Sequence, residues 1–312
     1  MTGRLLGGTA VREVSFAWLE ITGKCQLLCA HCYADSGPQG IHGAMRADDW
    51  RRVIEQLAAQ GVTMAQFIGG EPMLHPDLAE LIGFALDRGL RVEVFSNLVH
   101  VPPALWTVLE RDGVSLATSY YSDDPAEHAA VTGRPSHGRT RANIAEIVRR
   151  DIPLRAGVID VREGQRVSAG QRELETIGVR QIGTDRLRQV GRGVRDQRPD
   201  TSQLCGRCVS GVIAVSPDGS VWPCVFSRWL PVGNVLEAAL ADILGSPEAQ
   251  RVREELAADF AAREVSMTGR PKPPKPCDPA CGPSCGPACA PSCWPTGTGP
   301  CTPNGGCQPN YD

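Results

Sequence analysis

The sequence has no long apolar run, no excess of positive charge and no cysteine in its middle part. No stretch of roughly 18 consecutive apolar residues occurs, as a membrane-spanning helix would require, and the first 16 residues hold no apolar run of signal-peptide length. The formal net charge of -3 gives no overall positive field for nucleic acid or an anionic membrane surface. We therefore expect a soluble, cytoplasmic protein with neither nucleic acid nor a membrane among its partners.

The thirteen cysteines are unevenly placed. Three lie between positions 25 and 32, none between 33 and 204, and ten from 205 onward. The cytosol keeps thiols reduced, so metal ligation explains these cysteines better than disulfides do.

Short apolar runs alternate with longer amphipathic stretches from about Val14 to Ile182. This pattern is typical of repeated strand-helix units around a parallel sheet. The expected strands are residues 14–21, 62–68, 90–96, 114–121, 153–159 and 179–182. Six units are fewer than the eight of a closed barrel, so the predicted fold is α/β, a partial (β/α)6 TIM-like barrel with a small Cys-rich C-terminal extension. Its functional loops should follow the carboxyl ends of the strands.

The sequence changes character after residue 200. Residues 212–223 predict a hairpin around Pro-Asp-Gly, and residues 238–260 predict a helix that is interrupted near Gly245. The last 42 residues contain 12 prolines and 7 cysteines and cannot form a packed core by themselves. We expect a core at 1–198, a second region at 199–265 and a tail at 266–312.

Three thiols follow the first predicted strand within eight residues: Cys25, Cys29 and Cys32. Thiolates are the usual ligands of iron-sulfur clusters, and a cubane with four irons takes four ligands. Three cysteines leave one iron with the open coordination position that a catalytic centre requires. The alternative is a structural zinc site completed by His31, but zinc spacings usually pair two short knuckles. We take His31 as a bystander.

The spacing CxxxCxxC followed by Tyr33 resembles the signature loop of the radical S-adenosylmethionine (SAM) superfamily. The resemblance implies a 4Fe-4S cluster that binds SAM at its open iron and cleaves it to a 5′-deoxyadenosyl radical, with Tyr33 against the adenine. Gly69, Gly70, Glu71 and Pro72 end the second strand, where the family binds the SAM amine. Glycines permit close backbone approach, and a carboxylate can bind an ammonium group.

Three polar residues at the ends of the next two strands are weaker candidates for cofactor binding. Ser96 and Asn97 occupy the place of the family's Thr/Ser-Asn stretch, although a helix cap or turn is an equal alternative. Ser119 ends the fourth strand and is expected to contact the ribose or the carboxylate of SAM.

Two tyrosines and one arginine complete the candidate site. Tyr120 and Tyr121 follow Ser119 and are expected to contact the substrate, although an aromatic pair at a strand end more often serves packing. Arg192, one of several arginines after the sixth strand, is the candidate partner of the SAM carboxylate. Most of these arginines should be solvated.

The second cysteine region resembles the extension called SPASM or twitch. In that extension a cysteine, a glycine about ten residues on and a further cysteine frame an auxiliary 4Fe-4S cluster, and Cys208, Gly219 and Cys224 keep this spacing. With Cys205 close by, the resemblance implies at least one auxiliary cluster and a further ligand from the tail. The tail departs from the family, because its cysteines recur every fourth residue with prolines in step, which forbids a helix. Three interpretations of the tail stay open: it completes the first auxiliary cluster, it binds a second one, or it is flexible. Its candidate ligands are Cys277, Cys281, Cys285, Cys289 and Cys293.

Radical SAM proteins with this extension mostly modify peptides. The resemblance therefore implies a maturase that installs a thioether, a carbon-carbon or ether crosslink, or an epimer in a ribosomally made peptide, with flavodoxin or ferredoxin as electron donor. About 14 residues precede the first strand, too few for a leader-binding domain, so we expect leader recognition by a separate protein, the tail or the barrel mouth. The alternatives are a radical SAM enzyme that acts on a protein side chain or a small metabolite, and a noncatalytic protein that stores metal.

Overall fold

A computed structural model describes residues 14–195, 198–206, 208 and 211–268. These residues form a nine-stranded sheet with the order β6-β5-β4-β3-β2-β1-β7-β8-β9. The strands are β1 (Phe16–Thr22), β2 (Met64–Gly69), β3 (Arg91–Phe95), β4 (Val114–Tyr120), β5 (Leu154–Asp160), β6 (Gln181–Arg186), β7 (Val212–Val215), β8 (Ser220–Trp222) and β9 (Gly233–Asn234).

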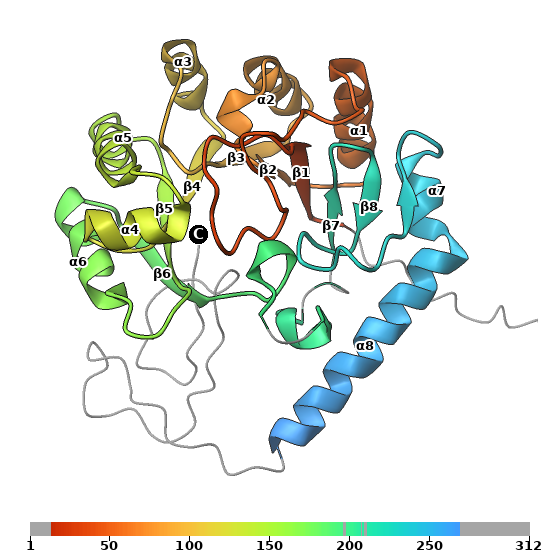
Figure 1. Ribbon diagram of the computed structural model, residues 1–312. Helices are drawn as coiled ribbons and strands as arrows, with labels where there is room; N and C mark the ends of the chain where they lie inside the picture. The colour runs from red at the N-terminus through yellow and green to blue at the C-terminus, as the bar shows by residue number, and fades with distance from the viewer. Residues whose placement is uncertain (1–13, 196–197, 207, 209–210, 269–312) are drawn as a thin grey trace, which may run out of the picture.

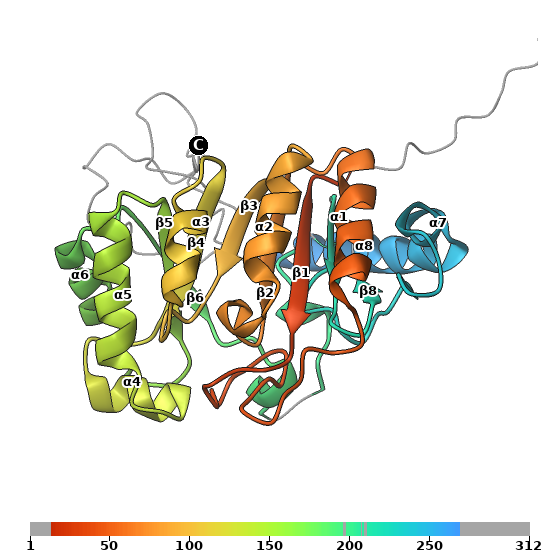
Figure 2. The ribbon, with the colours of Figure 1, turned by 90° about the horizontal axis from the view of Figure 1, so that it is seen from above.

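The strands β1 to β6 are all parallel, and each pairs with the next one along the chain. The helices that connect them cover one face of the curved sheet, as Figures 1 and 2 show. The predicted partial barrel is thereby confirmed. The helices are α1 (Ala47–Ala59), α2 (Leu78–Asp87), α3 (Trp106–Leu109), α4 (Pro125–Thr132), α5 (His137–Arg149), α6 (Val167–Ile177), α7 (Leu240–Gly245) and α8 (Pro247–Thr268), with 3-10 turns η1 (Pro72–Leu74), η2 (Pro103–Leu105), η3 (Gly191–Gly193) and η4 (Thr201–Gln203).

Alternate strand residues face the helices and form the main core. Leu19 of β1, Phe67 of β2 and Val94 of β3 are fully buried there, together with the apolar stripe of α1 that begins at Trp50. The residues between them face the hollow side of the sheet, which we call the lumen. Because this alternation has a period of two, neighbouring residues of one strand lie in different environments.

The C-terminal region continues the sheet on the other side of β1. Strand β7 pairs in parallel with β1, and β8 returns antiparallel after the turn at Gly219, whose φ is 86°. The predicted hairpin is thus confirmed, and it belongs to the main sheet. The predicted interrupted helix is present as α7 and α8.

One helix in the described part of the chain was not predicted. Helix α4 begins after Asp124, whose side chain accepts a hydrogen bond from the Glu127 amide (2.8 Å), and Pro125 occupies its first turn. Both are helix-start signals, but the segment is short and has little apolar periodicity. No helix among the described residues is long and apolar enough to cross a membrane.

Candidate functional site

The three N-terminal cysteines lie on the long loop between β1 and α1, which Figure 2 shows at the arrowhead end of β1. Cys25 is buried, and Cys29 and Cys32 are half-buried. Two sulfur atoms accept backbone hydrogen bonds: Cys25 Sγ from the Leu27 amide (3.4 Å) and Cys32 Sγ from the Ser36 amide (3.3 Å). N–H donors aimed at sulfur stabilise thiolates and tune iron-sulfur clusters.

The charge state of this loop also bears on what it can hold. Burial raises the pKa of Cys25 and of Cys29 to about 12, and the neighbouring cysteines contribute to both shifts. Three thiolates so close together need a cation to hold them. Among the described residues, no three His, Cys, Asp or Glu side chains converge closely enough to share one metal ion. A cubane instead takes each thiolate on a separate iron, so this donor set fits a 4Fe-4S cluster.

Arg192 supports the cysteine loop from η3, about 160 residues away in sequence. Its Nε donates to the Cys29 carbonyl (3.0 Å) and its backbone amide to the Cys32 carbonyl (3.0 Å), while Nη1 binds Asp35 (2.8 Å). The neighbouring Gly191 has a φ of 57°, and a Cβ atom there would lie 2.4 Å from the Tyr33 carbonyl oxygen. The structure thus brings Arg192 to the loop as a support, and its predicted contact with SAM stays a prediction.

The Gly-Gly-Glu-Pro segment lies against the start of the cysteine loop. A Cβ atom on Gly69 would lie 2.4 Å from the Thr22 carbonyl oxygen, and one on Gly70 would lie 2.3 Å from that of Lys24. The Glu71 amide donates to the Lys24 carbonyl (2.8 Å), and Pro72 then begins η1. Close backbone approach therefore explains why both positions are glycine.

The Glu71 carboxylate connects this segment to the end of β3. It is fully buried and accepts hydrogen bonds from the Met73 amide (3.0 Å), the Ser96 hydroxyl (2.8 Å) and the Asn97 amide (2.8 Å). Burial raises its pKa from 4.5 to about 7. The structure thus brings together Glu71, Ser96 and Asn97, which the sequence singled out separately.

Asn97 also reaches the cysteine loop. Its Nδ2 lies 3.6 Å from Cys25 Sγ, and its Oδ1 accepts from Gln26 Nε2 (3.0 Å). Its Oδ1 accepts from the Val99 amide as well (3.0 Å), which is the turn contact that the alternative interpretation predicts. Asn97 therefore shapes the turn and contacts the loop at once.

The aromatic candidates Tyr33 and Tyr121 lie on the lumen side. The Tyr33 hydroxyl is buried beside the Glu20 carboxylate, and its ring meets Phe226 edge-on at 5.3 Å. The Tyr121 ring lies edge-on to His31 at 5.0 Å. Burial raises the pKa of Tyr121, with smaller contributions from the cysteines, so the phenol stays neutral. Burial lowers the pKa of His31 to about 4.

Tyr120 lies on the face of the sheet opposite to Tyr121, and its predicted contact with the substrate stays a prediction. It is fully buried toward the helices, where its hydroxyl binds His137 Nε2 (2.8 Å) and Glu173 Oε2 (2.6 Å). The alternation of strand side chains is the reason: Leu116 and Tyr120 share the helix-facing side, whereas Ser119 and Tyr121 face the lumen. The contacts of Tyr120 are of the kind that the packing alternative predicts.

The lumen carries buried ion pairs that sequence reasoning missed. Glu20 is 1% exposed and binds Arg228 Nη1 at 2.7 and 2.8 Å, which joins β1 to the C-terminal region. Glu93 receives Nε and Nη2 of Arg155, both at 2.6 Å. The sequence does carry a signal for them: Glu20 and Glu93 each stand among apolar residues of a predicted strand. A charged residue at such a position indicates that one face of the sheet is polar and supplies a partner for the charge.

The second cysteine group lies beside the hairpin. Cys208 and Cys224 are buried with their sulfur atoms 3.2 Å apart, Cys205 is exposed, and the Cys224 amide donates to Ser227 Oγ (3.0 Å). The hairpin thus brings the Cys208 and Cys224 thiols together, and thiolates are the usual ligands of iron-sulfur clusters. The predicted tail ligands lie outside the described residues.

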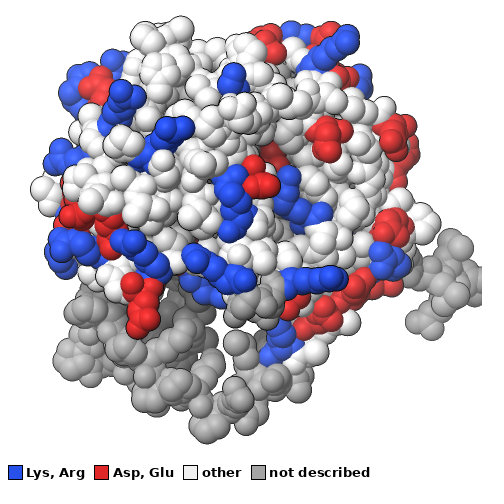
Figure 3. Space-filling model, in the orientation of Figure 1, with Lys and Arg blue, Asp and Glu red and all other residues white. Residues whose placement is uncertain are grey.

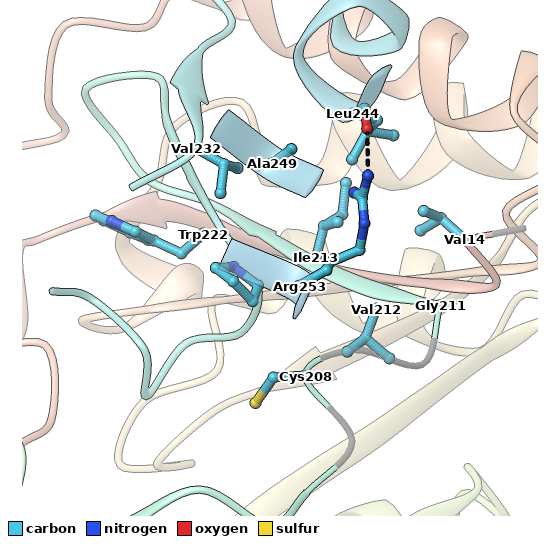
Figure 4. A pocket seen from close by; sticks show the side chains of 11 residues that line it. Val14, Cys208, Gly211, Val212, Ile213, Trp222, Val232, Leu244, Ala249 and Arg253 are labelled. Atoms are coloured by element: carbon cyan, nitrogen blue, oxygen red, sulfur yellow. Dashed lines mark hydrogen bonds between the residues drawn. The ribbon is translucent and has the colours of Figure 1, made fainter. Parts of the chain in front are cut away.

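Cys208 also borders a small cavity of about 50 Å³ between the hairpin and α8, shown in Figure 4. Val212 and Trp222 line it, and Arg253 crosses it to donate to the Leu244 carbonyl (3.0 Å). Its walls are mainly apolar, so it belongs to the packing between the sheet and α8.

Comparison with known families matches two parts of the chain. Residues 19–164 match the model described as Radical SAM superfamily, and residues 205–282 match the SPASM model, described as an iron-sulfur cluster-binding domain. A PqqA peptide cyclase of Xanthomonas campestris is 27% identical over 269 residues, which are 78% of this chain and 72% of the relative. An AdoMet-dependent heme synthase of Nitratidesulfovibrio vulgaris is 32% identical over 120 residues, 38% of this chain and 32% of the relative.

Solved structures show the same fold. Streptococcus suis SuiB bound to the precursor peptide SuiA superposes with a TM-score of 0.67 at 13% identity, covering 78% of this chain and 67% of SuiB. The enzyme anSMEcpe with bound AdoMet gives a TM-score of 0.60 at 12% identity, covering 78% of this chain and 83% of its own.

Proposed function

The chain belongs to the radical SAM superfamily and carries a SPASM domain, and from this premise we propose that it modifies a ribosomally made peptide. The 4Fe-4S cluster and SAM together supply a 5′-deoxyadenosyl radical, which abstracts a hydrogen atom from the substrate. The observation that carries the proposal is the set of three thiols at the end of β1, next to the Glu71 carboxylate.

Cys25, Cys29 and Cys32 are the proposed ligands of the SAM-binding cluster. The amide donors of Leu27 and Ser36 support two of them. The contacts of Arg192 to the loop carbonyls keep the three thiols in place. The proposed auxiliary cluster takes Cys205, Cys208 and Cys224, with tail cysteines as further ligands.

The Gly-Gly-Glu-Pro segment is the proposed site for the amine of SAM. Gly69 and Gly70 let the segment lie directly against the Thr22 and Lys24 carbonyls at the start of the cysteine loop, and Glu71 supplies the negative charge that an ammonium group requires. Asn97 and Ser119 line the same side as further proposed SAM contacts. Tyr33 is the proposed partner of the adenine, and its ring lies on the lumen side next to the cysteine loop.

A peptide is the proposed substrate because a relative is named PqqA peptide cyclase and SuiB has been solved with its precursor peptide. The proposed product is a crosslink or an epimer. The lumen-facing Tyr121 is the proposed substrate contact, and its neutral phenol lies beside His31. The proposed partners are flavodoxin or ferredoxin as electron donor and a separate leader-binding protein. The proposed division assigns residues 1–198 to the SAM chemistry, 199–265 to the auxiliary cluster and 266–312 to its completion.

The experiment uses anaerobically reconstituted, reduced enzyme with SAM and the synthetic peptide encoded by a short reading frame beside the gene. We expect 5′-deoxyadenosine and a change in peptide mass or, for an epimer, in residue stereochemistry. The Cys29→Ala variant is the control and should form neither product. Deoxyadenosine formed by the wild type without any change in the peptide would contradict a peptide substrate of this kind.

A further inference from the structure

The sheet ends in two edges of very different length. Strand β9 has two residues, whereas β6 has six and no hydrogen-bonded neighbour on its outer side in the part of the chain that the structure describes. None of the six β6 residues is buried. An exposed strand edge is a template for an added strand, and proteins usually protect it with proline or lysine. The β6 sequence QIGTDR contains neither.

The register shows which backbone groups face outward. The Leu187 amide donates to the Asp160 carbonyl of β5 (2.7 Å), so odd-numbered residues of β6 direct their N–H and C=O groups toward β5. The N–H and C=O groups of Ile182 and Thr184 therefore point to the free side. Thr184 is an exposed residue, and its N–H is one of these outward-pointing groups.

A row of small residues connects this edge with the candidate site. Ser119 of β4 is paired with Gly157 of β5, and Gly157 is paired with Gly183 of β6. All three face the lumen at the same level, and the two glycines contribute no side chain there. This row marks the direct line across the sheet from β6 to Ser119 and the neighbouring Tyr121.

We infer that the β6 edge docks an extended segment of the substrate peptide as an additional strand, an inference that rests on the proposed function. Neighbouring strands lie about 4.8 Å apart, so a strand added to β6 lies three spacings, or about 14 Å, from Ser119. An extended chain covers about 3.3–3.6 Å per residue. The docking segment is therefore separated by about four or more residues from the residue that is modified.

Charge indicates the chemistry of this segment. Arg186 ends the edge strand, and Arg195 and Arg198 follow it in the chain. All three are exposed, whereas Arg188 is paired with Asp185 (2.8 Å). Figure 3 shows Lys and Arg side chains along the lower part of the face that contains the site. A docking segment with acidic side chains complements this surface, and its binding should weaken with salt.

A backbone N-methyl scan of the gene-adjacent peptide tests the docking mode. An added strand presents every second amide to β6, so N-methylation should raise KM roughly 2- to 12-fold at alternate positions and little at those between. The sensitive positions should lie about four or more residues from the modified one. A scan with no alternation would overturn the inference while leaving the proposed function intact. If the wild type does not modify the peptide at all, the proposed function fails and the inference falls with it.

The Thr184→Pro variant tests the enzyme side. Proline removes the outward N–H but no hydrogen bond to β5, and edge strands tolerate it in this orientation. We expect KM for the peptide to rise roughly 2- to 12-fold or more, whereas Thr184→Val, which keeps the N–H, should bind like the wild type. Circular dichroism identifies a misfolded variant, in which case the N-methyl scan decides. Equal KM values for folded Thr184→Pro and Thr184→Val would overturn the inference.

Discussion

The buried carboxyl group of Glu71 gives the fold a pH dependence that can be measured. Its pKa is about 7 in the folded protein, against an ordinary value of 4.5. The raised pKa means that the folded protein disfavours the charged form of Glu71. The stabilisation that the neutral Glu71 carboxyl group contributes is therefore complete below pH 4.5 and is lost as the pH rises through 7. A shift of this size corresponds to roughly 3 kcal/mol above pH 7.

Glu71→Gln keeps the shape of the side chain and removes the titration. The amide has one acceptor oxygen, so at least one of the three donors that meet Glu71 loses its acceptor, at a cost of about 1–3 kcal/mol at every pH. At pH 5 this cost dominates, and the variant should be less stable than the wild type. At pH 8.5 the relief of the buried charge offsets it, so the difference in unfolding free energy should change by roughly 2–3 kcal/mol between the two pH values.

The assay is anaerobic urea unfolding without SAM at both pH values, followed by tryptophan fluorescence. Glu163→Gln, at an exposed position, is the matched control and should show no such change. Calorimetry with SAM adds a second measurement: affinity for the wild type should fall up to tenfold per pH unit below 7, and this dependence should vanish in Glu71→Gln. A stability difference that is the same at pH 5 and pH 8.5 would refute the reasoning.

Three other substitutions test the surroundings of the site. Arg192→Lys keeps the charge but cannot reproduce the guanidinium contacts to the cysteine loop. After gel filtration this variant should retain less iron per chain than the exposed control Arg195→Lys. Equal iron contents in the two variants would contradict the supporting role of Arg192. Gly70→Ala places Cβ 2.3 Å from a backbone oxygen and should abolish SAM binding in calorimetry. The control is Gly138→Ala in α5, where Cβ meets nothing within 4 Å. This control should raise the unfolding free energy by roughly 0.5–1 kcal/mol. Tyr120→Phe loses two buried hydrogen bonds and should lower the unfolding free energy by about 1–3 kcal/mol, with little change in deoxyadenosine formation. Lost activity at unchanged stability would instead place Tyr120 in the substrate site.

The order of strands and helices could be predicted from the sequence because each element carries its own period. The strand predicted at 14–21 is β1, Phe16–Thr22, and the amphipathic stretch that follows the cysteine loop forms α1. The parallel pairing of β7 with β1 could not be predicted, since it joins segments that are nearly 200 residues apart. Nothing in a hairpin motif specifies the strand that it pairs with.

The residues of the candidate site were predictable where a local motif carries the chemistry. The cysteine spacing and the Gly-Gly-Glu-Pro segment are such motifs. The contact of Arg192 with the Cys29 carbonyl is not, because it depends on how the chain returns after β6. The orientation of Tyr120 was predictable, since it stands four residues after Leu116 and therefore on the same, helix-facing side of the strand.

The central claim is that three thiols at the end of β1 hold the cluster at which SAM is cleaved. The direct measurement is 5′-deoxyadenosine formation by anaerobically reconstituted, dithionite-reduced enzyme, compared with a variant in which Cys25, Cys29 and Cys32 are all alanine. We predict that the wild type forms deoxyadenosine and that the variant forms none above the enzyme-free background. Undiminished deoxyadenosine formation by the variant would contradict the account.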